Sequence, residues 1–575
     1  MTIIRLRRPT RPASTKHAGS ARHPGLARKA AAALAALSLS FTLASCSSGA
    51  DADANDPAAA TGEPQEGGTL YWAIETKLQT VNPHRNSQDK ATPVLRNAYD
   101  SFLYRTEEGE YQPWLASGYE LSEDSKTLVL DLREGVTFSD GQTLDADAVV
   151  ANFDKLTSPG YLSNIPGGIR FLESYEKTGD LQVTFHLSQA DALFLFFLSS
   201  IQSTPLSPST LQLPQTDLES GGPELAGVGP FTITEFTPNT ELAFAKRADY
   251  QWAPESIADG QKAAYLDEVV YRTFAEGSTR TGSLSQGQVQ ISSDIQPVDV
   301  TTFEDDPNFT YVRNFVGGTP YSLYFNVSKA PLDDVRVREA FVRGFDRETI
   351  LNSIYTGAFD VAEAPLSAGE PFSDPTSLEG YTEDIDAANE LLDEAGWTER
   401  NSEGIRVKDG ETLTIRAVSA APFVRESRDQ LNIAIGAALK KNLGIEYLFE
   451  IEDLGTEDAR VQANDYEIFD NSYGGADVAS SVDVLYSSDP ERGFISRIKH
   501  GNADVDALVD AGRFNTDNAE REETYAQFQK LVADEFYVLP LYQTQDNLAY
   551  ANTVHGVTID PGTGQPFGAF KVWVD

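Results

Sequence analysis

Cysteine is nearly absent from this sequence, in which Cys46 is the one example among 575 residues. A single thiol excludes an internal disulfide framework and a zinc site made of several cysteines. Histidine is also scarce, and the four histidines that follow Cys46 are scattered: His84, His186, His500 and His555. Because their spacing matches no metal-binding motif, the sequence predicts no metal centre and no cofactor.

Short catalytic signatures are missing as well. The chain contains no G-x-S-x-G, H-E-x-x-H or C-x-x-C motif, and it has neither a P-loop nor a dinucleotide-binding fingerprint. Carboxylate pairs abound, but in so acidic a chain they say little about catalysis. We therefore expect that this protein is not an enzyme, and an exported hydrolase is the alternative from another class.

Positive charge is the third scarcity. The chain has 45 Lys and Arg against 87 Asp and Glu, which gives a formal net charge of −42. Basic residues are concentrated in residues 1–29, where no acid occurs, so the remainder of the chain is more acidic still. A surface of this charge repels nucleic acid and anionic lipid headgroups, and we expect neither to be bound through charge.

Long apolar runs are absent after residue 60, so no later segment is expected to span a membrane. Near the start, the basic residues lead into the apolar stretch Ala30–Ala44, a pattern typical of a secretory signal peptide over residues 1–45. A membrane-anchor helix is the alternative, but about 15 residues are few for a span.

The apolar stretch ends in Leu43-Ala44-Ser45-Cys46, which resembles the lipobox of bacterial lipoproteins. The resemblance implies cleavage before Cys46 and attachment of a lipid to its thiol. Residues 46–66 are small, polar and acidic, with Pro and Gly, and they predict a flexible tether behind the lipid. The expected location is the outer face of the cytoplasmic membrane.

Beyond the tether, candidate strands and helices alternate, which favours an α/β fold. "GGTLYWAIE" (67–75) and "KTLVLDLR" (126–133) read as strands, and "DADAVVANFDKL" (145–156) reads as a helix with an acidic cap. In residues 330–355 we expect Asp333 or Asp334 to cap a helix with Val337, Phe341 and Phe345 on one face and Glu339 paired with Arg343. "YAQFQKLVADEF" (525–536) predicts an amphipathic helix, and "YVLPLYQT" (537–544) a buried strand.

Five segments, in order, resemble the family 5 solute-binding proteins of bacterial ABC importers, the group of oligopeptide, dipeptide and nickel binders. The first segment contains both "YDSFLYR" and "YQPWLASGYELSEDSKTLVLDLREGVTFSDGQTLDADAVVANFD". The other four segments are "GVGPFTITEFTPNTELAFAKRADYQW", "YLDEVVYRTFAEGSTRTGSLSQGQVQI", "LYFNVSKAPLDDVRVREAFVRGFDRETIL" and "DIDAANELLDEAGW". The similarity extends from about residue 67 to the C-terminus.

The resemblance implies a two-lobed periplasmic-binding-protein-like fold of class II, cluster C. The first lobe is expected at 67–315 plus 547–575, with an extra subdomain at about 110–228, and the second lobe at 316–546. The crossovers near residues 316–322 and 541–547 are the hinge candidates. Gly317, Gly318 and Thr319 suit a hinge because glycine tolerates backbone rotation, and an ordinary surface turn is the alternative.

The resemblance also implies a function. Such a lipoprotein captures a ligand between its lobes and delivers it to an ABC permease and ATPase, acting as a monomer tethered through Cys46. A peptide is the first expectation. A nickel chelate, an opine, a sugar or another small solute remain open, as does a role in sensing peptides without import.

The predicted ligand contacts come from two segments. In the family, an Asp after a Gly/Trp-rich turn anchors the amino group of peptides, and the matching residue here is Asp477. The usual Trp falls on Tyr473 or Gly474, which departs from the pattern. The second segment is the loop after "NPH", where Arg85, Asn86 and Gln88 are placed to pair with ligand groups. For Tyr321 and Tyr324 beside the hinge, core packing is favoured over a place in the ligand site.

Overall fold

The computed structural model describes residues 63–575, apart from positions 87, 162, 164–166, 475–476, 490–491 and 493–496. The predicted signal peptide, Cys46 and most of the predicted tether lie outside the described residues. Within the described residues, no helix has both the length and the apolar character needed to cross a membrane.

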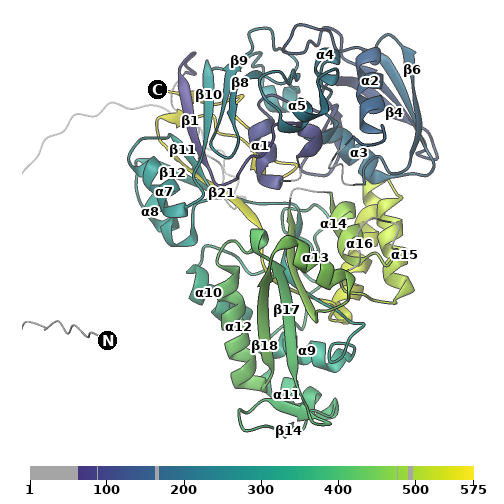
Figure 1. The fold of residues 1–575 in the computed structure, drawn as a ribbon, viewed down its shortest axis with the longest axis vertical. Coiled ribbons are helices and arrows are strands. Elements are labelled where there is room, and N and C mark those ends of the chain that lie inside the picture. The colour runs from purple at the N-terminus through teal and green to yellow at the C-terminus, as the bar shows by residue number, and fades with distance from the viewer. Residues whose placement is uncertain are drawn as a thin grey trace, which may run out of the picture. The chain divides into compact units, whose positions relative to one another are not determined.

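Lobe I is our name for β1 to β12 and β21 to β25 with their helices, where β22 (Val554–His555) pairs with β25 (Trp573–Val574) and β23 (Ile559–Asp560) pairs with β24 (Gln565–Pro566). Lobe I is built on a seven-stranded sheet of order β12-β21-β11-β1-β10-β9-β8 (Figure 1). Its strands are β1 (Thr69–Ile74), β8 (Phe231–Thr237), β9 (Glu241–Lys246), β10 (Glu268–Thr273), β11 (Ile291–Ser293), β12 (Phe309–Phe315) and β21 (Gln545–Ala551). β1 pairs in parallel with both β10 and β11, so the carboxyl ends of these three strands share one edge. α7 (Gly277–Ser285) packs against β1 and β11, and α8 (Val300–Glu304) packs against β12. Lobe I also contains the short helices α1 (Thr92–Leu95) and α6 (Glu255–Ala258).

A second, antiparallel sheet of order β4-β5-β7-β6 follows in lobe I. Its strands are β4 (Ala116–Leu121), β5 (Thr127–Leu132), β6 (Leu172–Gly179) and β7 (Gln182–Leu187). α2 (Ala146–Leu156) packs against β6 and β7 of this sheet, and α4 (Pro208–Leu211) packs against α2. The same part of the chain contains α3 (Ala192–Ser199), which contacts β2 (Leu103–Arg105), and α5 (Gln215–Ser220). β2 and β3 (Tyr111–Pro113) form a separate pair ahead of this sheet.

Lobe II, our name for β13 to β20 with their helices, has a five-stranded sheet of order β18-β17-β19-β13-β20. Its strands are β13 (Gly318–Phe325), β17 (Thr414–Ala420), β18 (Glu446–Glu452), β19 (Ile468–Gly474) and β20 (Val538–Tyr542). Its helices are α9 (Val335–Arg343), α10 (Arg347–Tyr355), α11 (Ile385–Glu394), α12 (Arg428–Leu443), α13 (Leu454–Gln462), α14 (Val478–Tyr486), α15 (Ala503–Arg513) and α16 (Asn518–Asp534). The small sheet of β14 (Glu399–Arg400), β15 (Arg406–Lys408) and β16 (Glu411–Thr412) lies far from lobe I (Figure 1).

The chain crosses between the two sheets twice, and the two crossings lie side by side. β12 ends at Phe315 and β13 begins at Gly318, while β20 ends at Tyr542 and β21 begins at Gln545. Val316 donates its backbone N–H to the Thr544 carbonyl at 3.0 Å, which ties the crossings together. All of β13 is buried, so Gly318 and Thr319 belong to a strand and not to the surface turn weighed as the alternative.

Most local expectations are confirmed. Asp145 caps α2 through a bond from the Ala148 N–H, and strands β1, β5 and β20 lie inside the expected segments. In residues 330–355 the expected helix is divided at Gly344 into α9, capped by Asp334, and α10, capped by Asp346. The Glu339–Arg343 pair forms at 2.8 Å. Tyr321 and Tyr324 are fully buried, as core packing requires.

Candidate ligand-binding cavity between the lobes

A cavity of about 1020 Å³ lies between the two lobes. Its volume lies at the upper end of the range of about 300–1,000 Å³ that is typical of ligand cavities. Lobe I contributes residues from four segments: Glu75–Lys77, Gln79–Thr80, Arg85–Asn86 and Gln88–Lys90 in the first; Thr216 and Glu219–Ser220; Asp294–Pro297; and Gln545 and Asn547. Lobe II contributes Phe359, Pro422–Phe423, Arg425–Ser427 and Leu454.

The strand order explains why these residues meet. Glu75 follows β1 directly, and Asp294 follows the parallel strand β11. In lobe II, Pro422 comes soon after β17, and Leu454 soon after the parallel strand β18. Ligand sites of α/β sheets lie beyond the carboxyl ends of parallel strands, where the side chains of the connecting loops converge. The cavity is therefore bounded by such strand ends in both sheets.

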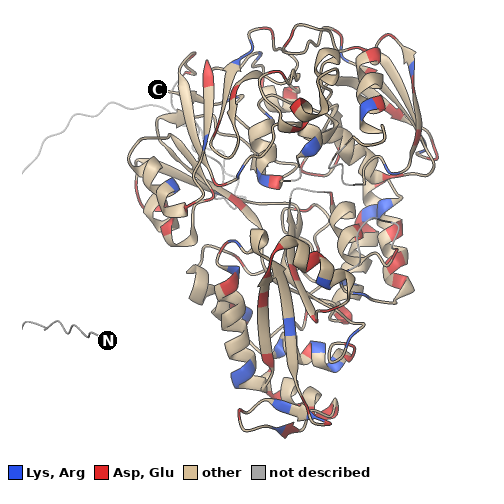
Figure 2. Ribbon diagram, viewed as in Figure 1, with Lys and Arg blue, Asp and Glu red and all other residues tan. Residues whose placement is uncertain are grey.

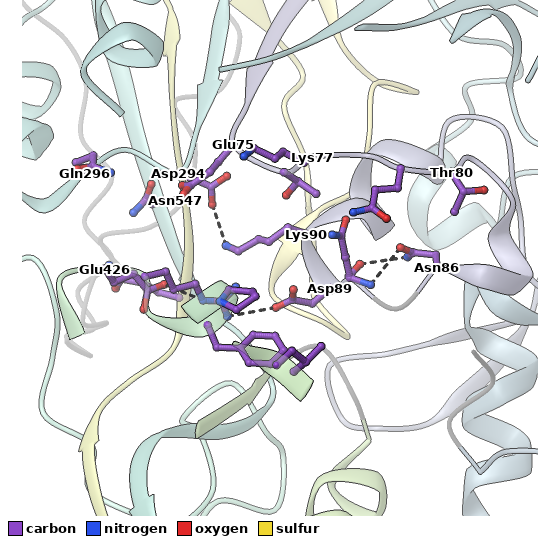
Figure 3. A pocket seen from close by; sticks show the side chains of 18 of the residues that line it. Glu75, Lys77, Thr80, Asn86, Asp89, Lys90, Asp294, Gln296, Glu426 and Asn547 are labelled. Atoms are coloured by element: carbon purple, nitrogen blue, oxygen red, sulfur yellow. Dashed lines mark hydrogen bonds and ion pairs between the residues drawn. The ribbon is translucent and has the colours of Figure 1, made fainter. Parts of the chain in front are cut away.

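Ion pairs occupy much of the cavity wall in lobe I. Lys90 Nζ lies 3.1 Å from Asp294 Oδ1 and also pairs with Asp546 on β21. Figure 3 shows Lys90 reaching across toward Asp294, with Glu75 nearby. Arg85 pairs with Glu219 at 3.1 Å. Lys90 and Arg85 thus already have carboxylate partners within lobe I.

One ion pair crosses the cavity from lobe to lobe. Arg425 of lobe II has its Nη2 3.7 Å from Asp89 Oδ2 of lobe I. Figure 3 shows Asp89 directed toward the segment that carries Glu426. At this distance Arg425 and Asp89 attract each other without forming a hydrogen bond. A ligand group that binds between them therefore disrupts only a weak interaction.

Glu426, a second charged residue on the lobe II wall, is kept ionised by its neighbours. Burial opposes ionisation of Glu426, but Arg428 and Arg425 outweigh it and lower its pKa to about 2. Tyr542 donates its hydroxyl to Glu426 Oε2 at 2.5 Å, and Arg428 Nη2 lies 3.1 Å from the same oxygen. Glu426 and Ser427 both have left-handed φ angles, of 56° and 58°. Consecutive left-handed residues other than glycine are strained, a condition that clusters at ligand sites.

Three of the predicted contacts line the cavity: Arg85, Asn86 and Gln88. The Asn86 side chain, however, is used within its own turn, since its Oδ1 accepts from the Gln88 N–H and its Nδ2 donates to the Gln88 carbonyl, both at 3.1 Å. Asn86 therefore shapes the loop that presents Gln88 and Asp89 to the cavity.

The other three predicted contacts, Tyr473, Gly474 and Asp477, are not among the residues that line the cavity. Gly474 ends β19, and a Cβ placed on it would lie 3.6 Å from Asp89 Oδ2, so it is adjacent to the wall. Asp477 is fully buried and caps α14, where its Oδ1 accepts from the Ala479 N–H and from Arg521. A role for these residues in ligand binding stays a prediction.

Sequence reasoning missed eight charged residues of the wall: Glu75, Lys77, Asp89, Lys90, Glu219, Asp294, Arg425 and Glu426. A signal was available for Glu75, which closes the predicted strand segment 67–75, because ligand sites lie beyond the carboxyl ends of parallel strands. Asp294 follows β11, a strand that was not predicted. For Arg425 and Glu426 no local signal exists, since their place depends on the turn between β17 and α12.

His84 does not line the cavity, although the loop that follows it does. It is fully buried, with its Nε2 2.9 Å from the Thr204 carbonyl and its Nδ1 3.1 Å from the Tyr161 hydroxyl. Both ring nitrogens are thus engaged by the protein. Across the described residues, no group of three or more His, Cys, Asp or Glu side chains is arranged to hold a metal ion.

Comparison with known proteins agrees with this architecture. The model of the bacterial extracellular solute-binding proteins, family 5, matches residues 110–493. The oligopeptide-binding protein AppA of Bacillus subtilis is 26% identical over 536 residues, which cover 91% of this chain and 94% of that protein. The di/tripeptide-binding protein 1 of Pseudomonas aeruginosa is 24% identical over 476 residues, covering 78% of this chain and 83% of its own.

Solved structures show the same fold. The structure of AppA in complex with a nonapeptide superposes with a TM-score of 0.72 at 21% identity, covering 89% of this chain and all of that one. The structure of NikA from Brucella suis in complex with Fe(III)-EDTA has a TM-score of 0.76 at 22% identity, with 88% of this chain covered and all of that one. With the family match extending over most of the sequence, these findings confirm the predicted two-lobed α/β fold: the chain belongs to the family 5 bacterial extracellular solute-binding proteins.

Proposed function

We propose that this protein captures a peptide between its two lobes outside the cytoplasm and delivers it to an ABC importer. The observation that carries the proposal is the cavity of about 1020 Å³ whose wall is shared by lobe I and lobe II. Closure on a ligand held by both walls shifts the population toward the closed form. Relatives named for binding oligopeptides and di- or tripeptides support a peptide as the ligand.

The proposed contacts are Gln88 and the loop around it in lobe I, and Arg425 in lobe II. Amide groups suit a peptide backbone because they donate and accept hydrogen bonds at once. Phe359 and Phe423 also line the cavity, and Phe423 is 50% exposed, which leaves apolar surface for a side chain of the ligand.

The further parts of the proposal concern location and partners. A lipid on Cys46 would tether the monomer to the outer face of the cytoplasmic membrane, and residues 47–66 would let it reach a permease with its ATPase. The chemistry proposed is reversible binding, and no bond of the ligand is made or broken.

Native mass spectrometry of the chain beginning at Ser47, purified without denaturation, tests the proposal. Retained host peptides should appear as a series of adducts, and Gln88→Ala should reduce their fraction. Thr137→Ala is the control, because Thr137 is not among the residues that line the cavity. If no adduct appears and peptide pools leave the melting temperature unchanged, the peptide proposal fails, because a ligand of the native state must stabilise it by mass action.

A second candidate ligand class is a solute without a free ammonium group. The observation that favours it is the engagement of Asp477 with two arginines of the protein, Arg105 and Arg521. In the same thermal-shift assay, opines, sugars and metal chelates test this class.

A further inference from the structure

Two acids of lobe II meet an arginine of lobe I in a buried cluster beside the crossings. Arg105, the last residue of β2, places its Nη2 3.0 Å from Glu370 Oε1 and 3.8 Å from Asp477 Oδ2. Its Nη1 donates to the Gly562 carbonyl of lobe I at 3.2 Å, which anchors the guanidinium on its own side. Arg105, Glu370 and Asp477 are 6%, 2% and 0% exposed.

Arg521 of α16 completes the cluster. Its Nη2 donates to Asp477 Oδ1 at 2.6 Å, and its Nε donates to the Gly512 carbonyl at 3.1 Å. Two guanidinium groups therefore face two carboxylates, and the buried charges balance. Burial opposes ionisation of Asp477, but Arg521 and Arg105 outweigh it and lower its pKa. The ionised form of Asp477 is therefore stabilised by arginines of the protein, without a ligand.

The cluster connects the crossings with the cavity. Glu370 Oε2 accepts the Gly318 N–H at 3.2 Å, at the first residue after the crossing into lobe II. Asp477 lies three residues beyond Gly474, which packs next to Asp89 of the cavity wall. Because Arg105 belongs to lobe I and both acids to lobe II, opening the lobes would separate these charges.

We propose that Arg105 determines ligand specificity, by supplying from the protein itself the positive charge that draws Asp477 and Glu370 of lobe II onto lobe I. A ligand ammonium group is then not needed for closure, because Arg105 and Arg521 already balance the charge of Asp477. The ligands of this protein are accordingly peptides or other solutes whose amino end is blocked, absent or unrecognised. The statement about ligands rests on the proposed capture function. The role of Arg105 in closing the lobes does not depend on that function.

Lobe closure without ligand is the first measurement. In the full chain carrying Cys46→Ser, Val298→Cys on lobe I and Ile433→Cys on lobe II provide two labelling sites, at side chains 75% and 67% exposed. Because the chain has no other cysteine, the label pair is unique. Fluorescence energy transfer then reports the distance between the lobes.

The expected result is a shift of the ligand-free population toward longer distances in Arg105→Gln. Arg406→Gln is the matched control: Arg406 is equally buried, but it bonds Asp393, Asn389 and carbonyl groups within lobe II. It should lower stability without changing the distance. An unchanged distance in Arg105→Gln overturns the closing role. Should that variant not fold, Arg105→Lys, which keeps the charge but loses the planar fork, should give an intermediate shift.

Ligand specificity is the second measurement. A hexapeptide pool with free amino termini and the same pool N-acetylated should bind the unmodified protein with equal affinity. Arg105→Gln, which leaves Asp477 with Arg521 alone, should favour the free amine by about tenfold, the effect of one charge-assisted hydrogen bond.

The outcomes separate the inference from the proposed function. A strong preference of the unmodified protein for free amines, lost in Asp477→Asn, overturns the inference while supporting peptide capture. If neither pool binds, peptide capture fails, and the label distances still decide whether Arg105 closes the lobes.

Discussion

At the scale of single residues, burial and partners decide what each ionisable group does. Asp477 is a ligand contact predicted from the sequence, yet it is fully buried and accepts a hydrogen bond from Arg521. His84 is fully buried as well, with a hydrogen bond to the Thr204 carbonyl. Asp100 is also fully buried, and its Oδ2 accepts from the Tyr250 hydroxyl and the Trp252 indole N–H, each at 3.0 Å. These groups tie stability to pH in ways that composition does not reveal.

His84 should make the protein less stable in acid. Burial lowers its pKa to about 4, against 6.5 for an ordinary histidine. Between pH 4 and pH 6.5, His84 is protonated in the unfolded chain but stays neutral in the folded protein. The contribution of neutral His84 to the free energy of unfolding is therefore complete above pH 6.5 and is lost as the pH falls toward 4. His84→Gln should remove this loss, worth about 3 kcal/mol at most.

Denaturant unfolding at pH 7.5 and pH 5 measures the effect. His186→Gln is the matched control, because the His186 side chain on β7 is 39% exposed. An acid loss of equal size in His84→Gln and in the unmodified protein would contradict the prediction.

Asp100 should act in the opposite direction. Burial raises its pKa to about 7, although Tyr250 and Arg96 partly offset that rise. Between about pH 4 and pH 7 the folded protein holds a proton that the unfolded chain has released, so unfolding becomes easier as the pH rises. Asp100→Asn should abolish this slope and be more stable than the unmodified protein at pH 8, by about 4 kcal/mol at most. The same unfolding series checks it, and a slope that persists in Asp100→Asn would refute it.

At the scale of elements, local signals predicted most helices and strands because caps and periodicity are local properties. Asp145, Asp334 and Asp346 each start a helix by accepting a backbone N–H, as such residues do at helix ends. The division between α9 and α10 at Gly344 was not predicted. A Cβ there would lie 2.6 Å from Leu443 of α12, so a contact with a helix distant in sequence requires the glycine.

Gly318 is the element-scale position most sensitive to substitution. Its φ is +99°, and an added Cβ would lie 1.9 Å from the Tyr473 carbonyl oxygen of the neighbouring strand β19. Gly318→Ala should therefore destabilise the protein by more than about 1 kcal/mol, since both strain and a backbone clash oppose it.

Gly282→Ala is the control for that substitution. Gly282 lies within α7, and its added Cβ would meet Gln286 at 3.7 Å, an ordinary contact. Alanine is favoured over glycine in helices by about 0.5–1 kcal/mol, so this variant should be at least as stable as the unmodified protein. Equal denaturation midpoints for the two variants would show that the crossing tolerates a side chain.

At the scale of the whole molecule, charge is spread across both lobes. Figure 2 shows Lys and Arg interspersed with Asp and Glu along the described elements of both. The cavity joins segments far apart in the sequence, from Glu75 to Asn547. Its integrity thus depends on both lobes and both crossings.

Ligand binding should protect both walls together in hydrogen exchange. On addition of a bound peptide, backbone amides in residues 88–90 and 294–296 of lobe I should slow, as should those in 423–427 of lobe II, because closure removes water from the whole cavity. Residues 399–412, which form β14 to β16 far from the cavity, should be unchanged. Protection confined to one lobe would place the ligand elsewhere.

The sequence by itself determined the family, the α/β class and the bounds of many elements, because these follow from caps, periodicity and ordered local segments. It also indicated the loop of Arg85, Asn86 and Gln88, which follows a short motif. Only the tertiary structure decided that Arg425 meets Asp89 across the cavity and that Arg105 faces Asp477. Those pairs join residues more than 300 positions apart. The burial and the partner of a charged residue depend on how the two lobes pack together, and the sequence alone does not reveal either.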